Sequence, residues 1–433
     1  MTREIARYAL TLVEAAEALD EGDMMAGELA DAQLARVVAT DAAVEAWTAC
    51  DPQHVRGEAL RCDGTRGRAA LRGIGIGVKD IIDTVDLPTT MGSPIYEGHR
   101  PGHDASCIAR LKAHGGFVFG KTVTTPFAFL DPGKTRNPWD PGRTPGGSSS
   151  GSAAAVAVGH VAGAIGTQNN GSVIRPAAFC GVVGFKPTLH AIPYAGAHPF
   201  SETFDTVGTF TRTVEDAARL AGALADAGRV SGTITPRAGR PRLAYLGHFP
   251  WTVLDCDADA VVESAVTTLR AHADVVAIDI PPAWRGANTL HRTIMLFEAA
   301  RNLRELQGRE RHRLPPLLNG ALDEGRAVTQ DAYDDARSAR EEAIAFFTQW
   351  VAGFDAILAP SALGPAPWGL GSTGDPACCT LWSLLGFPAL NLPVGHFGGL
   401  PMGLQLAAPQ GRDDSLLSVA AWCEARLPFR GLV

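Results

Sequence analysis

The sequence lacks the basic excess that marks many nucleic-acid-binding proteins. Its 46 Asp and Glu residues outnumber its 38 Lys and Arg residues, which gives a net charge of −8 spread along the chain. Without a basic stripe, binding to nucleic acid is not expected. The apolar stretch near the N-terminus contains acidic residues, unlike a secretory signal peptide, so we expect a cytoplasmic protein.

Cysteine pairs with a recognisable spacing are missing as well. The eight cysteines lie at positions 50, 62, 107, 180, 256, 378, 379 and 423, and none forms a CxxC or another spacing typical of metal ligands. In a chain without export signals they are expected to be reduced thiols. The sequence therefore predicts neither a disulfide framework nor a metal site.

Charged side chains are absent altogether from residues 144–174. The length would suit a membrane helix, but the stretch contains GGSSSGS near its start, TQNNGS near its end, and His160 in between. Its apolar part, AAAVAV…VAGAIG, is too short and too rich in glycine to cross a bilayer. We therefore expect no membrane contact, and instead a segment that is buried inside the protein and has polar, uncharged ends.

Long linkers and internal repeats are also lacking, which favours one large domain over residues 1–433. Apolar residues three and four apart predict a helical N-terminal segment of about residues 1–55. Beyond it, short apolar strands alternate with helices, which predicts an α/β fold with a central mixed β-sheet flanked by helices. The Gly- and Arg-rich residues 231–241 are interpreted as a loop. Strands are expected within 72–84 and at 117–120, 161–166, 242–247, 356–360, 390–395 and 403–408, and helices at 104–116, 152–159, 256–273, 287–306 and 331–353. Asp104 is the expected N-cap of its helix.

Two motif matches lack the structural context that their chemistry needs. Residues 115–122, GGFVFGKT, fit the phosphate-loop pattern, but a helix precedes the first glycine and an apolar strand occupies the middle. Residues 147–151, GSSSG, place Ser149 where an α/β-hydrolase has its nucleophile, but a loop precedes them instead of a strand. Nucleotide binding through 115–122 is kept as the alternative from another class of function, and the α/β-hydrolase is disfavoured.

Three other segments place amine or hydroxyl groups in apolar or glycine-rich surroundings. Lys79 closes the strand GIGIGV, where partial burial would lower its pKa and make it a neutral base. PGGSSSGSAAAV clusters serines after a glycine pair, which is also typical of a helix N-cap. GTQNNGSVIRP places Ser172 after a tight turn, where backbone N–H groups are suited to an oxyanion hole.

Over a core of about residues 60–215 the chain resembles the amidase signature family, through the motifs GIGVKD, GGSSSGSAAA and GSVIRPAAFCGVVGFKPT taken together. Within that family its sequence is most similar to malonamidase-type amidases. The resemblance implies a Ser–cis-Ser–Lys triad. Ser172 would be the nucleophile that forms an acyl-enzyme, Ser148 would bridge after a cis Gly147–Ser148 peptide, and Lys79 would be the base. It implies no metal or organic cofactor, a small-molecule amide as substrate, and leaves a homodimer open.

The chain departs from the family immediately before the nucleophile. The family's common sequence at these positions is TGGS or a close variant of it, whereas this chain has Asn169, Asn170, Gly171 and Ser172. The N–H groups of these four residues are expected to form the oxyanion hole, because they belong to the backbone and survive any change of side chain. The asparagine side chains are expected either to narrow the pocket or to add a hydrogen-bond donor.

Three further polar residues have two open interpretations each. The hydroxyls of Ser150 and Thr167 are expected to orient Ser148 and Ser172, or else to form a cap and a turn. Arg175 follows the nucleophile closely, and in malonamidase-like relatives the matching arginine pairs with a substrate carboxylate. A structural ion pair that holds the loop is the other interpretation of Arg175.

Phe127, Phe129 and Leu130 are interpreted as an apolar wall near the site, although they are equally typical of a core.

The favoured function is hydrolysis of a small carboxamide, such as an aryl or alkyl amide or a carbamate-like compound. A malonamidase-like hydrolase of carboxylated amides and the glutaminase subunit of a tRNA-dependent amidotransferase are alternatives, and the short length disfavours the second. A catalytically inactive binding protein stays open because of Asn169 and Asn170.

Overall fold

The computed structural model describes residues 6–64, 69–235, 237–429 and 431–433. Outside the described residues lie positions 1–5 of the expected helical segment, positions 65–68 of the signature core, and Pro236 of the expected loop.

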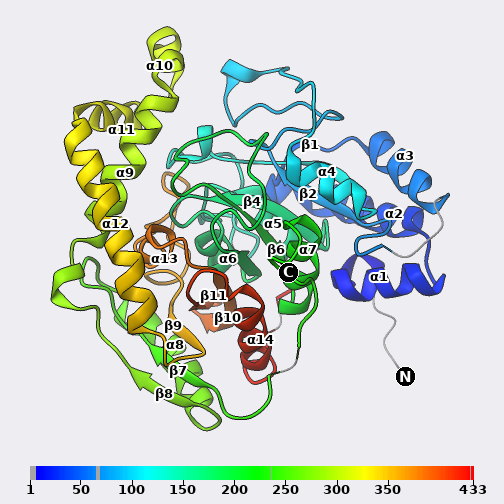
Figure 1. Cartoon of the computed structure of the whole chain (residues 1–433). Coiled ribbons are helices and arrows are strands. Elements are labelled where there is room, and N and C mark those ends of the chain that lie inside the picture. Colours follow the sequence, from blue (N-terminus) through cyan, green and yellow to red (C-terminus); the bar gives the residue numbers. More distant parts are fainter. Residues whose placement is uncertain (1–5, 65–68, 236, 430) are drawn as a thin grey trace.

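One mixed β-sheet of eleven strands runs through the molecule (Figure 1). The strands are β1 (Trp47–Ala49), β2 (Gly75–Lys79), β3 (Phe117–Thr122), β4 (Gly163–Gln168), β5 (Val183–Lys186), β6 (Thr206–Thr211), β7 (Arg242–Tyr245), β8 (Asp274–Ala277), β9 (Ala356–Pro360), β10 (Ala389–Phe397) and β11 (Leu400–Ala407). Their order across the sheet is β1-β3-β2-β4-β6-β5-β10-β11-β9-β7-β8. Strands β2 to β6 are buried along their whole length, which is why their sequences form continuous apolar or glycine-rich runs. The predicted α/β fold with a mixed sheet is confirmed.

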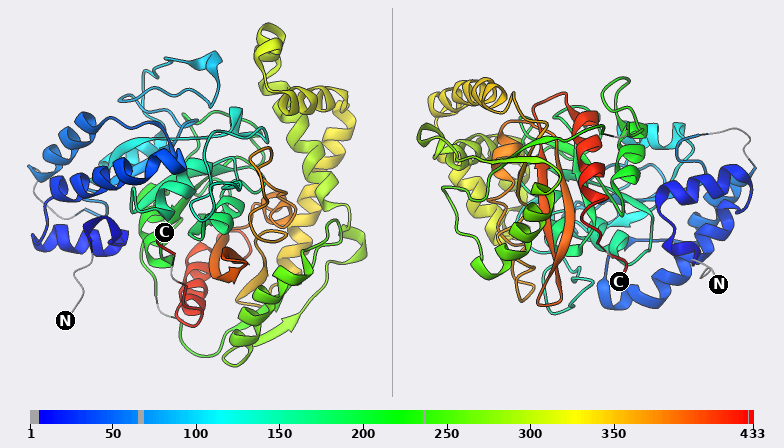
Figure 2. Two further views of the ribbon diagram at one scale, coloured as in Figure 1. Left: turned by 180° about the vertical axis from the view of Figure 1, so that it is seen from behind. Right: turned by 90° about the horizontal axis from the view of Figure 1, so that it is seen from below.

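Helices flank this sheet on both faces, and the two ends of the molecule carry different groups of them. Within the described residues the helices are α1 (Leu12–Glu21), α2 (Ala26–Val44), α3 (Pro52–Asp63), α4 (Ser106–Ala113), α5 (Ser150–Ala157), α6 (Ile174–Cys180), α7 (Val214–Leu224), α8 (Cys256–Arg270), α9 (Ala287–Asn302), α10 (Arg304–Glu310), α11 (Pro316–Ala327), α12 (Gln330–Trp350), α13 (Thr380–Leu384) and α14 (Asp413–Glu424). Helices α1 to α3 lie at one end, and α9 to α12 lie together at the other (Figures 1 and 2).

The uncharged segment forms the interior of the molecule, as expected. Helix α5 is buried at every position, because its serines, alanines and glycine are small enough for the chain to approach its neighbours closely. A Cβ atom added to Gly151 would lie 2.3 Å from the carbonyl oxygen of Ala46 and 2.4 Å from the backbone nitrogen of Val123, so only glycine fits there. Among the described helices, none has the length and the hydropathy that crossing a bilayer requires.

Several local expectations need correction. The segment expected to be helical over about residues 1–55 contains two helices, α1 and α2, which Gly22 separates in a left-handed conformation, and then the short strand β1 and the start of α3. Helix α4 begins after the start of its expected range with Ala105 as N-cap, and Asp104 instead accepts hydrogen bonds from Val85 N and Lys112 Nζ. Helices α6, α7, α11, α13 and α14 and strands β6 and β8 were not expected. The described cysteines are free thiols, as expected.

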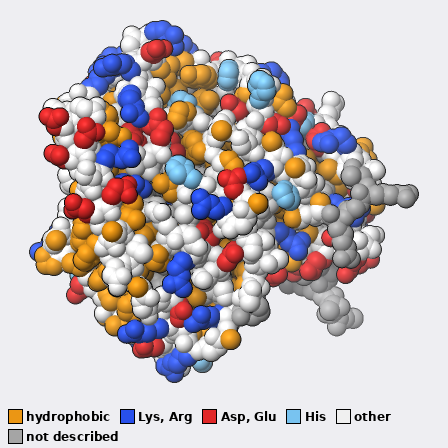
Figure 3. Space-filling view, viewed as in Figure 1, with side chains coloured by type: hydrophobic (Ala, Val, Ile, Leu, Met, Phe, Trp, Pro, Cys, Tyr) orange, Lys and Arg blue, Asp and Glu red, His pale blue; other side chains and the backbone are white. Residues whose placement is uncertain are grey.

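The outer surface agrees with the charge distribution of the sequence. On the face shown in Figure 3, acidic and basic side chains are interspersed with each other and with apolar side chains. Most of the ion pairs in the described part of the chain join partly exposed side chains, such as Arg292 with Glu324 and Arg311 with Asp323. The face shown therefore carries no extended patch of a single charge sign.

Candidate active site

Lys79 lies at the carboxyl end of β2, beside the end of β4. The two strands are parallel neighbours in which Val78 is paired with Ile165, so the residues that follow both meet at the same edge. Lys79 Nζ is 2.7 Å from Ser148 Oγ and 2.9 Å from Oγ1 of Thr167. The expected contact between Lys79 and Ser148 is therefore present, and Thr167 contacts the lysine, not either serine.

Burial controls the charge of Lys79. Its side chain is fully buried, and loss of hydration lowers its pKa well below the ordinary value of 10.5, while the nearby Asp205 carboxylate raises it by a smaller amount. The same burial raises the pKa of Asp205 to about 8. A buried amine that gives up its proton this readily is suited to act as a base near neutral pH.

Ser148 is buried between the sheet and helix α5. The Gly147–Ser148 peptide bond is cis, as the family resemblance implied. Two hydrogen bonds hold the backbone on either side of this bond: Arg175 Nη2 donates to the carbonyl oxygen of Gly147 at 2.7 Å, and Thr125 N donates to that of Ser148 at 3.2 Å. The hydroxyl of Ser148 is thereby fixed against Lys79.

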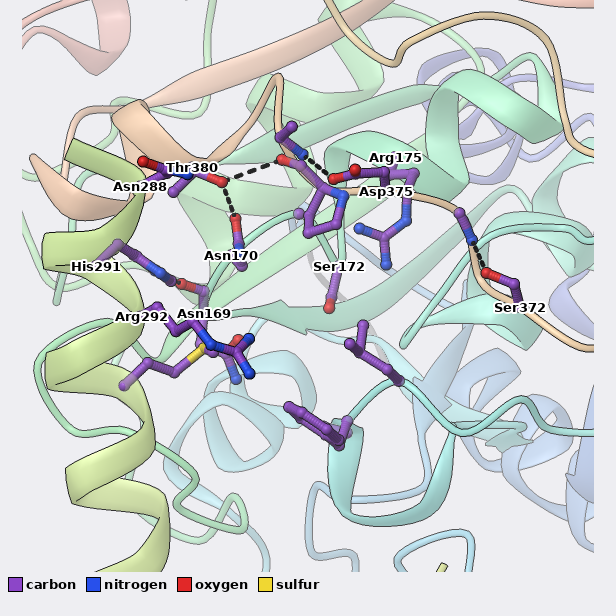
Figure 4. A pocket seen from close by; sticks show the side chains of 18 of the residues that line it. Asn169, Asn170, Ser172, Arg175, Asn288, His291, Arg292, Ser372, Asp375 and Thr380 are labelled. Atoms are coloured by element: carbon purple, nitrogen blue, oxygen red, sulfur yellow. Dashed lines mark hydrogen bonds between the residues drawn. The ribbon is translucent and has the colours of Figure 1, made fainter. Parts of the chain in front are cut away.

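Ser172 lies between β4 and α6, on the wall of a cavity of about 450 Å³. Figure 4 shows its hydroxyl directed into the pocket. Residues from five separate parts of the chain line this cavity: Ala128, Phe129, Leu130, Asn169, Asn170, Gly171, Ser172, Arg175, Trp251, Asn288, His291, Arg292, Met295, Ser372, Gly374, Asp375, Pro376, Ala377 and Thr380. The volume is within the range of ordinary small-molecule sites.

The loop before Ser172 is tied to the C-terminal half of the chain through its carbonyl groups. His291 Nε2 donates to the carbonyl oxygen of Asn169 at 2.9 Å, and the hydroxyl of Ser383 donates to that of Asn170. Within the described residues, no hydrogen bond is donated by the N–H groups of Asn170, Gly171 or Ser172. The loop therefore offers unused backbone donors next to the Ser172 hydroxyl.

The side chain of Asn170 is fixed as well. Its Oδ1 accepts a hydrogen bond from the Thr380 hydroxyl at 2.9 Å, which Figure 4 shows. This bond turns the amide nitrogen of Asn170 away from Thr380. The space beside Gly171 is filled, since an added Cβ would lie 2.9 Å from Pro376 Cβ and 3.0 Å from Arg175 Nη1. The surrounding residues therefore accommodate an asparagine side chain at position 170 and leave no room for a side chain at position 171.

Arg175 is buried and uses two of its three nitrogens for structure. Nε donates to the carbonyl oxygen of Thr373 at 2.8 Å, and Nη2 binds Gly147 as described above. Nη1 is buried without a partner among the described residues and lies beside Gly171. Burial lowers the pKa of Arg175 to about 10, which still leaves the guanidinium charged at neutral pH. Arg175 therefore supports the loops and has one donor left over.

The structure places Phe127 and Ser150 away from the roles that the sequence suggested. Phe127 does not line the cavity, because its ring is buried against Tyr96 and His198, while its neighbours Phe129 and Leu130 do line it. The Ser150 hydroxyl donates to the carbonyl oxygen of Val123 and so contacts neither Ser148 nor Ser172. Both residues support the packing around the site.

The two motif matches that were set aside are both interior structure. Lys121, at the end of the phosphate-loop pattern, is buried in β3, 3.4 Å from Asp80, and donates to the carbonyl oxygen of Ile82. The Ser149 hydroxyl is buried against the backbone of Thr167 and does not line the cavity. Neither residue is placed to bind a phosphate or attack a substrate.

Sequence reasoning missed the residues that reach the site from the C-terminal half. His291 and Met295 come from α9, Thr380 and Ser383 from α13, and Trp251 from the loop after β7. A signal for α13 lies in residues 374–395, GDPACCTLWSLLGFPALNLPVG, which also resemble the amidase signature family. A helix was expected at 287–306, but nothing in the sequence marks His291 as a residue of the site, because a histidine in an amphipathic helix is common.

A mixed sheet that carries a buried Lys–Ser pair and a cis Gly–Ser peptide bond beside a cavity is typical of amidase signature enzymes. Comparison of the sequence with protein families agrees: the amidase family matches residues 28–417, so the chain belongs to this family. It is an enzyme that hydrolyses amide C–N bonds.

Two comparisons with individual proteins are informative. The chain is 33% identical to a glutamyl-tRNA(Gln) amidotransferase subunit from Roseiflexus castenholzii (strain DSM 13941 / HLO8), over 95% of this chain and 94% of the relative. It is 32% identical to the protein of the same name from Oleidesulfovibrio alaskensis (strain ATCC BAA-1058 / DSM 17464 / G20), over 97% and 98%.

Solved structures of amide hydrolases have the same fold. Native peptide amidase from Stenotrophomonas maltophilia matches with a TM-score of 0.82 and 28% identity, over 97% of both chains. 6-Aminohexanoate cyclic dimer hydrolase matches with a TM-score of 0.85 and 25% identity, over 98% of both chains. An amidase crystal structure matches with a TM-score of 0.86 and 30% identity, over 96% of this chain and 100% of the other.

Proposed function

We propose that this amidase hydrolyses a small, neutral carboxamide through a seryl acyl-enzyme, with Ser172 as nucleophile, Ser148 as bridging serine and Lys79 as base. The observation that carries the proposal is the 2.7 Å contact between Lys79 Nζ and Ser148 Oγ, in a site where burial lowers the pKa of the amine well below its ordinary value and Ser172 lies on the cavity wall. Family membership supports the same roles.

The chemistry follows from these positions. Neutral Lys79 takes the proton of Ser148 while Ser148 takes the proton of Ser172, and Ser172 Oγ attacks the amide carbonyl. The proton then returns through Ser148 to the nitrogen of the leaving amine, the C–N bond breaks, and an ester to Ser172 remains. Water hydrolyses the ester by the same relay and releases a carboxylic acid. Thr167 accepts a hydrogen bond from Lys79 and holds its amine toward Ser148.

The loop of Asn169, Asn170, Gly171 and Ser172 supplies the oxyanion hole in this scheme. Its free N–H groups are next to the attacking oxygen, and preorganised backbone donors of this kind stabilise the negative charge that develops on the carbonyl oxygen. The hole thus depends on the backbone, so the departure at Asn169 and Asn170 does not abolish catalysis.

The cavity lining favours a neutral, partly apolar substrate. Phe129, Leu130, Met295 and Trp251 supply apolar surface, and His291 is uncharged at neutral pH because burial lowers its pKa to about 4. The amide nitrogen of Asn170 adds a neutral donor. An aryl or alkyl amide, or a carbamate-like compound, matches this combination of surfaces.

The glutaminase subunit of an amidotransferase is the second candidate. The curated relatives described above carry the amidotransferase name and align with this chain over nearly its whole length, which gives this alternative more weight than the sequence alone did. The unpartnered Arg175 Nη1 similarly supports a malonamidase-like enzyme that binds a carboxylate. A homodimer and a cytoplasmic location stay predictions.

A panel of five substrates separates these candidates: benzamide, acetanilide, phenyl carbamate, malonamate and glutamine. The proposal expects the purified chain alone to hydrolyse one of the first three fastest. Fastest turnover of malonamate would assign the malonamidase-like function. Glutamine hydrolysis that appears only when the other chains of an amidotransferase are added would assign the second candidate.

A further inference from the structure

Two residues from the C-terminal half determine how the loop before the nucleophile faces the cavity. The carbonyl of Asn169 is fixed by His291 on α9, and the carbonyl of Asn170 is fixed by Ser383 on α13. Neither α9 nor α13 contains a member of the proposed triad. In Figure 4, His291 approaches the loop from the helix side, and Ser172 lies on the opposite side of Asn169.

Planarity of the peptide bond transmits these two contacts to the N–H groups. The peptide bonds after Asn169 and Asn170 are trans, since the cis bond of the described chain is the one before Ser148. In a trans peptide the C=O and the N–H point in opposite directions. The Asn169 carbonyl is held toward His291, so the N–H of Asn170 points away from α9. The Asn170 carbonyl is held toward Ser383, so the N–H of Gly171 points away from α13.

His291 is built into a rigid position. Its side chain is buried, and its ring is stacked on Phe204 with the ring centres 4.3 Å apart. Because burial lowers the pKa of the imidazole and keeps it neutral, one ring nitrogen carries a proton and the other does not, and the contact with Asn169 requires the proton on Nε2. The ring is thus a single-proton donor with one orientation.

Ser383 belongs to a second chain of hydrogen bonds, which ends at the two residues that follow the nucleophile. Gln168 Nε2 donates to the Ser383 hydroxyl at 3.1 Å, and Gln168 Oε1 accepts hydrogen bonds from the N–H groups of Val173 and Ile174. The residues on both sides of the 169–172 loop are therefore held by one side chain. With Ser383 removed, the carbonyl of Asn170 and the amide of Gln168 both lose a partner.

We propose that His291 and Ser383 are positioning residues of the oxyanion hole, which aim the N–H groups of Asn170 and Gly171 at the carbonyl oxygen of the bound amide. This inference rests on the proposed function of Ser172. It assigns a role in transition-state stabilisation to two residues that do not react, and it makes α9 part of the catalytic apparatus as well as a wall of the cavity.

The test compares two replacements of His291 in the whole protein. His291→Phe keeps a ring against Phe204 but removes the donor, while His291→Gln offers an N–H at a similar reach without the ring. We expect His291→Phe to lower kcat by about 10- to 100-fold, less than the loss of a direct oxyanion donor, with KM changed less than about threefold. His291→Gln should recover most of kcat. Thr293→Ala, at a half-buried position of the same helix that does not line the cavity, is the control and should equal the wild type.

A second readout separates positioning from folding. The rate at which a fluorophosphonate labels the nucleophile depends on the same N–H groups, so it should fall in parallel with kcat for His291→Phe and for Ser383→Ala, while melting curves show that both variants are folded at the assay temperature. Wild-type labelling and kcat in His291→Phe and Ser383→Ala would overturn the inference, as would His291→Gln being no better than His291→Phe. If instead Ser172→Ala retains activity, the proposed function itself fails.

Discussion

The half of the chain that contains β2 to β5 and the half that contains α9 to α13 contribute to the same cavity in different ways. The first half supplies the residues of the proposed triad, Lys79, Ser148 and Ser172, and all three are buried. The second half supplies apolar lining and hydrogen bonds to backbone and side chains, from His291, Thr380 and others. The residues of the proposed triad therefore all come from the first half, whereas both halves line the cavity.

The difference teaches why the two halves tolerate change differently. Around Lys79 a small displacement breaks a 2.7 Å contact, and the close packing at Gly151 leaves no room for repacking. The lining from α9 can exchange one apolar side chain for another with only a change in fit. Substitutions in the first half should therefore act on kcat, and substitutions in the second half mainly on KM, apart from the positioning contacts proposed above.

The largest effect is expected for Ser172→Ala. Removing the nucleophilic oxygen should lower turnover by about 10⁶-fold, as for other serine hydrolases. The fold should be unchanged, because the hydroxyl is directed into the cavity. Steady-state kinetics and a melting curve measure both. Ser149→Ala is the matched control: if that variant loses activity and Ser172→Ala keeps it, the assignment of the nucleophile is wrong.

Lys79→Ala should follow, with a loss of about 10³- to 10⁴-fold, the upper range for a general base. Lys79→Arg should not restore activity, because a guanidinium stays protonated. The pH profile carries the sign: the base works only when deprotonated, so kcat should fall as the pH drops through the lowered pKa of Lys79 and level off above it. A flat profile between about pH 5 and 9, with chemistry rate-limiting, would contradict the role of the lysine.

Arg175→Lys should have an intermediate effect on every substrate. Lysine cannot replace both the Nε bond to Thr373 and the Nη2 bond to Gly147, so we expect a lower melting temperature and roughly tenfold lower kcat/KM for malonamate and acetanilide alike. Measuring both substrates on both proteins tests this. A loss of about a hundredfold or more that is confined to malonamate, about the strength of a charge-assisted pair, would show that Arg175 binds a substrate carboxylate.

The smallest effect is expected at the departure from the family. Thr380→Val removes the hydrogen bond that orients the Asn170 amide, and we expect KM for a neutral amide to rise about fivefold, as for one ordinary hydrogen bond, with kcat nearly unchanged. Asn170→Gly should give the same change. If the two variants differ strongly, or if kcat falls instead, the Asn170 side chain does not bind the substrate.

The sequence pointed to the part of the candidate site that lies in the first half of the molecule, and it missed the part that the second half contributes. Lys79, Ser148 and Ser172 lie in segments rich in glycine and serine, because the backbone of neighbouring segments approaches closely and only small residues fit there. Such a restriction on residue size is visible in a sequence. The contact of His291 with Asn169 spans 122 positions and depends only on how α9 packs. Phe127 and Ser150 were assigned to the site because they are close to its other residues in the sequence. The Phe127 ring packs in the core, although its neighbours in the same turn line the cavity, and the Ser150 hydroxyl binds the backbone of Val123.

The most direct test of the central claim is to identify the residue that carries the acyl group. The wild-type protein is incubated with a fluorophosphonate, digested, and its modified peptide located by mass spectrometry, with Ser172→Ala and Lys79→Ala treated in parallel. We predict modification of Ser172 in the wild type, none in Ser172→Ala, and strongly slowed modification in Lys79→Ala. Modification of Ser149, or of no serine at all in a protein that turns over amides, would contradict the assignment of Ser172 as nucleophile.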